Sequence, residues 1–255
     1  MSFSLEYFDV FFLILVRISA FIYTAPFFSV KGVPIRVKTG FSIFLTFIIF
    51  FSKPFDMPNY TNVITFSIII VLEAIAGALM GLFANIAYYI LSFAGRIIDM
   101  EIGFSMVNQL DPISMIQTSI TSNLYGYLVM LMMMVTYLHH YFILGIIDSF
   151  EIINIGKVTL NPNIYKLGIS FITDYFIIGF RIVLPIFAAI LIVNTLLGIL
   201  IKIAPQMNMF VIGLQVKILV GLIVLLIIIS MIPAVSDFIF NKMIEMFREV
   251  TKYLA

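Results

Sequence analysis

Long apolar runs alternate with short polar segments along this chain of 255 residues. A helix that crosses a membrane needs about 20 predominantly apolar residues. Because the apolar residues follow one another without the polar alternation of a membrane β-barrel, the runs predict helices. We therefore expect an all-α integral membrane protein of about six hydrophobic helices arranged as hairpins, over residues 8–28, 41–51, 63–94, 124–147, 171–201 and 211–232.

The lengths of these runs are uneven. The second run is too short to cross a membrane unless it recruits residues from Val37 onward. The third and fifth runs exceed one crossing, which predicts steep tilt, an extension beyond the bilayer, or a break. Pro185 lies within the fifth run, where its missing backbone donor would kink a helix.

Two polar segments stand out between the apolar runs. One is GFSMVNQLDP at 103–112, and the other is APQMNMF at 204–210. Residues 113–123 continue the first segment with hydroxyl and amide side chains. Non-helical backbone at membrane depth is tolerated only where protein buries it or water reaches it. The first segment is therefore either a loop that lines or blocks an aqueous pore or an ordinary connection outside the membrane.

The second polar segment predicts the turn of a helical hairpin. Pro205 would end the first helix, and Phe210 would anchor the tip. Gln206 and Asn208 have the donors and acceptors to satisfy backbone groups freed at the helix ends. We expect this turn to serve assembly with other chains.

Composition supports the membrane class and excludes others. Apolar residues make up 63% of the chain and charged residues 11%, and the mean hydropathy is +1.19. A net charge of +1 argues against binding of nucleic acid, and the absence of cysteine excludes disulfides.

Glu6 and Asp9 precede any Lys or Arg, so we expect the first run to be retained and not cleaved as a signal. Lys and Arg divide evenly between the two sides of six alternating spans, so they assign no orientation.

Three ionisable residues lie inside apolar runs: Arg17, Glu73 and Arg181. A charge at membrane depth is costly and usually faces a partner or water. They could form an ion or proton relay, or they could pair with one another or with a neighbouring subunit to fix helix register. We favour structural pairing, because a relay needs several titratable groups in series and arginine does not release its proton near neutral pH.

No catalytic or metal-binding pattern is found in the sequence. His139 and His140 are the two histidines, and adjacent residues on a helix point about 100° apart, which suits a shared metal ion poorly. Glycine-rich phosphate loops, HExxH and a nucleophile elbow are missing from the sequence. We expect no enzyme activity, no metal and no cofactor.

Two further patterns predict helix contacts. Gly77 and Gly81 are four residues apart, a small-residue spacing that lets helix backbones approach closely. Residues 240–254 place apolar side chains at helical spacing between charged ones. We expect this amphipathic helix to lie along a partner chain or at the membrane surface.

Taken in order, the motifs of this chain resemble the FliR family of flagellar biosynthesis proteins, whose injectisome counterparts are called SctT. The resemblance covers nearly the whole length. It rests on the following residues: Arg17-Ile18-Ser19-Ala20, Ala25-Pro26, Val33-Pro34, Arg36, Lys38, Glu73, Gly77, Gly81, Gly95, Asp99, Gly103-Phe104-Ser105-Met106, Asn108, Asp111-Pro112, His140, Asp148-Ser149-Phe150, Pro185, Asn194, Leu197-Gly198, Ala204 to Phe210, Gly213 and Lys217. Family members usually have proline where this chain has Gln215, and glycine near Met115, so the start of the last hydrophobic helix and the shape of the loop can differ.

This resemblance implies a non-enzymatic subunit of the type III export gate in the bacterial inner membrane, within the flagellar basal body. Such a subunit forms, with FliP-like and FliQ-like chains, the pore for unfolded export-substrate polypeptides, next to FlhB-like and FlhA-like neighbours and membrane lipid. It also implies a FliP-like part over residues 1–150 and a FliQ-like hairpin with the amphipathic helix over residues 165–255.

In the family, the loop after the Gly-Phe-Ser-Met motif plugs the resting pore. Carried onto this chain, the plug would lie within residues 108–123. The plug and pore-loop candidates are Phe104, Ser105, Met106, Asn108, Asp111, Pro112, Ser114 and Met115. An uncharged loop rich in hydroxyls can block ions without binding a passing polypeptide tightly.

A different class of function remains open. The chain could act alone as a small-solute transporter or ion channel, with Glu73, Asp99 and Arg181 along its path. Transporters often consist of two related halves with matching broken helices. The sequence shows no such internal repeat, which favours the export-gate interpretation.

Overall fold

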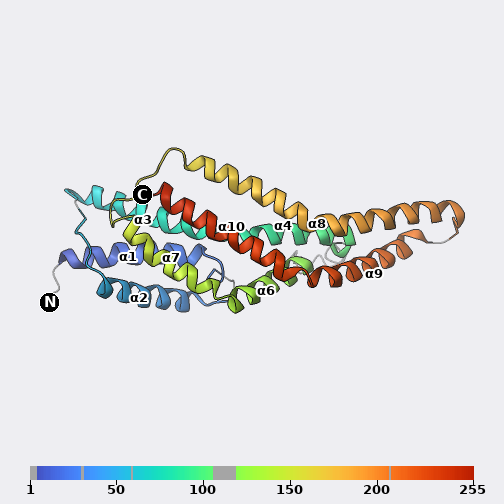
Figure 1. Ribbon diagram of the computed structural model, residues 1–255, viewed down its shortest axis with the longest axis horizontal. Helices are drawn as coiled ribbons and strands as arrows, with labels where there is room; N and C mark the ends of the chain where they lie inside the picture. The colour runs from blue at the N-terminus through green and yellow to red at the C-terminus, as the bar shows by residue number, and fades with distance from the viewer. Residues whose placement is uncertain (1–4, 30–31, 59, 106–118, 207) are drawn as a thin grey trace. The chain divides into compact units, whose positions relative to one another are not determined.

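The computed structural model describes residues 5–29, 32–58, 60–105, 119–206 and 208–255. All regular elements in these ranges are helices, which confirms the expected all-α class (Figure 1). The helices form two compact units, and each unit draws on several separate stretches of the chain.

The first unit comprises residues 1–87, 133–171 and 240–255. It contains α1 (Leu5–Thr24), α2 (Ile35–Ser52), α3 (Val63–Ala84), α7 (Leu138–Ile152) and most of α10 (Ile232–Tyr253). α1 packs against α3 and α2, and its side chains from Val10 to Ile22 supply much of the buried core. Because α1 is apolar on most of its faces, it can be covered on several sides at once.

The apolar face of α10 is buried within the first unit. Phe247 lies edge-on to Phe21 and to Phe142, with ring centroids 6.0 and 5.7 Å apart, and Met243 and Val250 are fully buried. The expectation that residues 240–254 lie along a partner chain or the membrane surface is therefore wrong. An amphipathic pattern shows that one face needs cover, but not whether the same chain provides it.

The second unit comprises residues 88–132 and 172–239. It contains most of α4 (Ile86–Ile102), most of α6 (Ile120–Val135), most of α8 (Ile164–Ile203) and all of α9 (Met209–Ile229). The Phe93 ring of α4 packs among Tyr175, Phe176 and Phe180 of α8. Ile102 of α4 lies against Gly221 of α9. Aromatic and branched side chains thus join α4 to the α8–α9 hairpin.

Five of the described helices are long and apolar enough to cross a membrane, and the count is six if the bent pair α6 and α7 is taken as one span. This agrees with the six hydrophobic runs, although their bounds differ. The second run does recruit residues upstream, since α2 begins at Ile35. The fourth run is interrupted at Tyr137, which has a left-handed backbone with a φ of 57°.

Of the two runs that are longer than one crossing, the third is the one in which a break occurs. α3 ends at Ala84, and Asn85 turns the backbone before α4 begins at Ile86. The Asn85 side-chain amide donates to the carbonyl oxygen of Thr24 at 3.2 Å, so the break is held by α1. An isolated asparagine within an apolar run was the only local signal for it.

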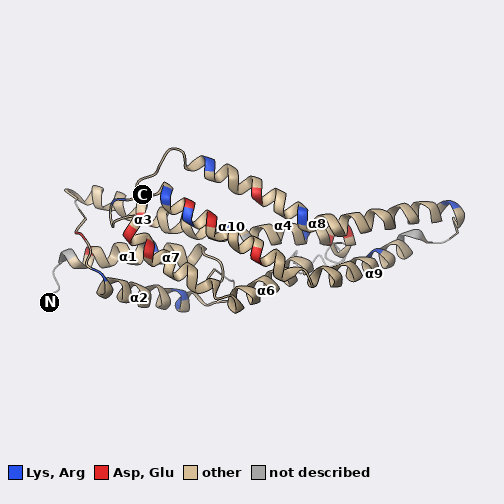
Figure 2. Ribbon diagram, viewed as in Figure 1, with Lys and Arg blue, Asp and Glu red and all other residues tan. Residues whose placement is uncertain are grey.

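α8 is one helix of 40 residues that continues through Pro185. At 1.5 Å per residue it is about 60 Å long, roughly twice the hydrocarbon thickness of a bilayer. Many apolar side chains on α2, α8 and α9 are exposed, among them Phe44, Phe51, Leu196 and Leu226. Charged residues recur along α10, whereas α2 and α9 carry few (Figure 2). These surfaces require lipid or other chains as cover.

Candidate functional site

A buried ion pair joins α1 to α3 in the first unit. The guanidinium of Arg17 contacts the carboxylate of Glu73 twice, Nε to Oε2 at 2.5 Å and Nη2 to Oε1 at 3.0 Å. Both side chains are fully buried. A charge at such a position is tolerated only when it is paired and its remaining hydrogen-bonding groups are satisfied.

The remaining polar groups of this pair are satisfied by the end of α7 and the loop after it. Arg17 donates through Nη1 to the carbonyl oxygen of Ile153 at 3.1 Å and, more weakly, to that of Ser149 at 3.4 Å. The Gly156 amide donates to Glu73 Oε1 at 2.9 Å. The Phe150 ring lies 4.3 Å from the Arg17 guanidinium carbon. The cluster thus fixes three helices in register, as expected for structural pairing.

Arg181 lies elsewhere, on α8 in the second unit. It is exposed, and within the described ranges it forms no ion pair. The structure therefore brings together two of the three ionisable residues singled out in the sequence and leaves the third on a surface.

Gly77 and Gly81 lie on the face of α3 that touches α1. A Cβ atom at Gly77 would lie 2.1 Å from the carbonyl oxygen of Arg17, and one at Gly81 would lie 2.0 Å from Thr24 Oγ1. Real Cβ atoms do not approach backbone this closely, so only glycine permits this helix separation. The two helices are in contact along the stretch that carries the ion pair.

In the second unit, Asp99 joins the two ends of the loop that contains the plug candidates. Its Oδ1 accepts hydrogen bonds from the Thr121 amide at 3.1 Å and from Thr121 Oγ1 at 2.5 Å. It therefore caps the start of α6 from a neighbouring helix, in addition to the local N-cap residue Ser119, whose Oγ accepts a hydrogen bond from the Ser122 amide at 3.1 Å. At Gly95 a Cβ would lie 2.3 Å from the Ser122 amide nitrogen, so α4 and the start of α6 are in close contact.

Most of the plug candidates themselves lie outside the described residues. Phe104 and Ser105 are described, follow α4 directly and are half-buried. The others fall outside the described ranges: Met106, Asn108, Asp111, Pro112, Ser114 and Met115. The structure thus defines the base of this loop at Asp99 and Thr121.

The hairpin turn between α8 and α9 is exposed. α8 ends at Ile203, two residues before Pro205, as expected from the missing amide of proline. Gln206 and Asn208 are exposed, and Asn208 precedes α9 without a side-chain capping bond. The expectation that Asn208 satisfies a freed backbone group is therefore wrong. The side chain of Phe210 lies outside the described part.

The two histidines occupy the start of α7. His139 stacks on Phe27 with ring centroids 5.6 Å apart, and its ring lies 4.2 Å from that of His140. Within the described ranges, no group of three or more His, Asp or Glu side chains is placed to hold a metal ion. The pair thus packs among aromatic rings.

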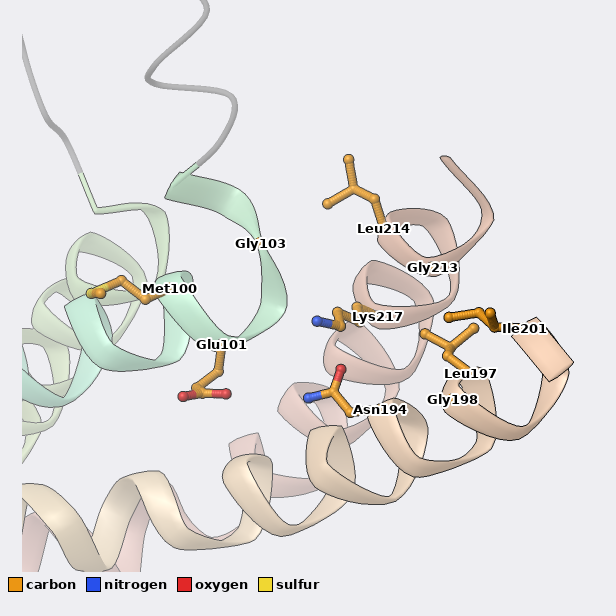
Figure 3. A pocket seen from close by; sticks show the side chains of 10 residues that line it. All are labelled: Met100, Glu101, Gly103, Asn194, Leu197, Gly198, Ile201, Gly213, Leu214 and Lys217. Carbon is orange, nitrogen blue, oxygen red and sulfur yellow. The ribbon is translucent and has the colours of Figure 1, made fainter. Parts of the chain in front are cut away.

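A pocket of about 500 Å³ lies between the end of α4 and the α8–α9 hairpin, entirely within the second unit. Its polar lining residues are Glu101, Asn194 and Lys217, and their polar ends point into one space (Figure 3). The sequence motifs contained Asn194 and Lys217, but not their meeting with Glu101. Only the packing of the hairpin on α4 brings these three together.

Comparison with protein families identifies the class of the chain. Residues 8–243 match the family described as bacterial export proteins, family 1. The chain belongs to this family.

Curated relatives of this export family member are similar over almost their full length. The flagellar biosynthetic protein FliR of Bacillus subtilis (strain 168) is 31% identical, covering 98% of this chain and 97% of the relative. FliR of Escherichia coli (strain K12) is 27% identical, covering 98% of this chain and 95% of the relative. FliR of Buchnera aphidicola subsp. Schizaphis graminum (strain Sg) is 33% identical, covering 87% of this chain and 85% of the relative. These matches confirm the resemblance to the FliR family.

The role of Asp99 within this export family member was not apparent from the sequence. Ser119, just before α6, acts as a local N-cap, because its Oγ accepts a hydrogen bond from the Ser122 amide at 3.1 Å. A second acceptor for the start of α6 comes from α4, 22 residues upstream of Thr121. A cap supplied from another helix has no local sequence signal.

Proposed function

We propose that this chain is a non-enzymatic subunit of the flagellar type III protein export gate. The match to the bacterial export family over residues 8–243, together with relatives named as flagellar biosynthetic proteins, supports this proposal. Its place would be the inner membrane at the flagellar basal body. The long apolar helices agree with a membrane location.

The proposed gate forms its pore from this chain and FliP-like and FliQ-like chains, next to FlhB-like and FlhA-like neighbours. The apolar surfaces of α8 and α9 support assembly, because about 60 Å of α8 exceeds what lipid alone can cover. Residues 1–150 would be the FliP-like part, and residues 165–255 would be the FliQ-like hairpin with α10.

The proposed plug is the loop between α4 and α6. The bonds from Asp99 to Thr121 support it, because they hold both ends of the loop at one point. A loop with a fixed base can move its tip without separating the helices that carry it. Unfolded polypeptides could then displace the tip while the gate stays assembled.

The transporter alternative gains no support from the three residues on which it depends. Glu73 is fully buried in its pair with Arg17, and Asp99 is bound to Thr121. Both carboxylates thus serve helix packing. Arg181 is exposed on a different helix.

Co-expression tests the proposed assembly. The tagged full-length chain is produced with and without FliP-like and FliQ-like chains from the same genome, and the membranes are solubilised and purified. We expect a stable complex that contains all three chains, and poor recovery of the chain when it is produced alone. A well-behaved monomer that transports a small solute into liposomes would contradict the proposal.

Deletion of residues 113–118 tests the plug. This deletion keeps Thr121, so the bonds to Asp99 remain possible. We expect an assembled gate that leaks ions, measured as increased membrane conductance in cells. Loss of the complex on purification would show that the loop is needed for assembly. An intact complex with unchanged conductance would refute the plug.

A further inference from the structure

The pocket in the second unit combines opposite charges that do not neutralise each other. Glu101 comes from the last turn of α4, Asn194 from α8 and Lys217 from α9. Within the described part of the chain, Glu101 and Lys217 form no ion pair with each other or with another residue. Figure 3 shows their charged ends directed toward the same space.

Three polar side chains that face a shared cavity define the chemistry of its ligand. The ammonium of Lys217 needs an acceptor, best an anion, and the carboxylate of Glu101 needs a donor, best a cation. The amide of Asn194 can donate or accept. A ligand that carries a positive and a negative group a few ångströms apart would satisfy both charges at once.

The rest of the pocket is apolar. Its lining includes Met100, Leu197, Ile201 and Leu214. Gly198 and Gly213 also line it and have no side chain to fill the space. Small-molecule sites commonly combine such a lining with a few polar groups, and a volume of about 500 Å³ lies within their range. The ligand should therefore be amphipathic, with apolar chains that continue onto the exposed apolar face of the hairpin.

The position of the pocket along the hairpin fits the headgroup region of a membrane. Asn194 and Lys217 are nine and eight residues from the facing ends of α8 and α9, at Ile203 and Met209. At 1.5 Å per residue, each lies within about 14 Å of the hairpin tip. The headgroup layer and the outer part of the hydrocarbon together occupy a similar depth. Basic pockets between membrane helices are known to hold lipid headgroups.

We propose that this pocket binds the headgroup of a phospholipid that carries both a phosphate and a primary ammonium, as phosphatidylethanolamine does. Lys217 binds the phosphate, Glu101 accepts hydrogen bonds from the ammonium, and Asn194 bonds to either group. Phosphatidylcholine has the same charges, but its quaternary ammonium has no hydrogen to donate to Glu101. Phosphatidylglycerol has the phosphate and lacks the cation.

The proposal depends on the membrane location and not on the role in export. The test uses the full-length chain, solubilised from membranes with the chains that co-purify with it. Each of the three lipids is added at matched mole fraction, and bound lipid is measured by native mass spectrometry. The midpoint of thermal aggregation of the tagged chain provides a second measurement.

We expect the wild-type chain to prefer phosphatidylethanolamine over both other lipids. Glu101→Gln should lower the affinity for phosphatidylethanolamine by about tenfold or more, since it replaces a hydrogen bond to a charged carboxylate with one to a neutral amide. It should leave phosphatidylglycerol binding unchanged. Lys217→Met should weaken binding of both lipids, and Lys202→Met, at the end of α8, should weaken neither.

Asn194→Ala removes no charge and keeps the test decisive if a charge variant fails to accumulate. It should lower phosphatidylethanolamine binding several-fold while the thermal midpoint without added lipid stays unchanged. Equal binding of the three lipids by the wild-type chain, or an unchanged preference in Glu101→Gln, would overturn the proposal. A pocket filled by a neighbouring chain would likewise show no lipid preference.

Discussion

At the scale of single residues, the Arg17–Glu73 pair has the largest energetic consequence. Each partner satisfies the other, and Ile153 and Gly156 complete their hydrogen bonds. Burial of two charges costs several kcal/mol, which the pairing and the added bonds offset. Loss of one partner leaves the other charged and buried, so the single variants should be worse than a variant that lacks both charges.

Arg17→Met and Glu73→Met should each destabilise the first unit by about 3–5 kcal/mol. The double variant Arg17→Met with Glu73→Met should lose less than either single variant, because no unpaired charge remains. The amount of tagged chain in membranes and its thermal aggregation midpoint measure the effect. A double variant whose loss equals the sum of the single losses would show that the two side chains are not coupled.

At the scale of helices, the sequence predicted the kinds of element better than their ends. Apolar runs identified the helices, and the Gly77–Gly81 spacing identified a close contact. The break at Asn85 and the cap from Asp99 to Thr121 were not predictable, because each depends on a residue from another helix. Structural pairing of Arg17 was the favoured interpretation of the sequence, but its partner was left open, since a sequence does not show which helices are neighbours.

Gly77→Ala tests the contact between α1 and α3. The added Cβ meets the backbone of Arg17, which does not yield easily, so we expect a loss of about 1–3 kcal/mol. Gly40→Ala on α2 is the matched control, since nothing lies within 4 Å of the added carbon. The control should be neutral or slightly stabilising, because alanine favours helix. Thermal midpoints of both variants would decide, and equal midpoints would contradict a close contact.

Asp99→Ala tests the base of the loop between α4 and α6. Removal of the acceptor frees the Thr121 amide and hydroxyl, at a cost of about 1–2 kcal/mol for a lost cap. We expect faster hydrogen exchange of the amides at the start of α6, measured by mass spectrometry. Thr121→Ser keeps both donors and should exchange like the wild type. Unchanged exchange in Asp99→Ala would mean that the cap does not hold the loop base.

At the scale of the whole molecule, the exposed surfaces indicate where other chains bind. The turn between α8 and α9 carries exposed Gln206 and Asn208, whose side chains make no hydrogen bond within the described part of the chain. Their polar side-chain groups are therefore available to partners.

The family and the membrane class were predictable from sequence, because both depend on residue order and hydropathy. The pocket of the second unit was not predictable, because it depends on how three helices meet.

Gln206→Leu combined with Asn208→Leu should impair assembly. We expect much less FliQ-like chain to co-purify, because two polar contacts are lost at the hairpin tip. Asn154→Leu with Asn163→Leu makes the same chemical change at exposed positions of the first unit and should leave co-purification unchanged. Normal recovery of partners with the tip variant would exclude a role for this turn in assembly.

The length of α8 has a consequence for the living cell. α8 is about twice as long as the lipid interior is thick, so part of its apolar surface stays in contact with water whenever partner subunits are absent. The newly synthesised chain would then be prone to aggregation or proteolysis. We therefore expect bacteria to synthesise it in step with the proteins that shelter it, and to clear any surplus.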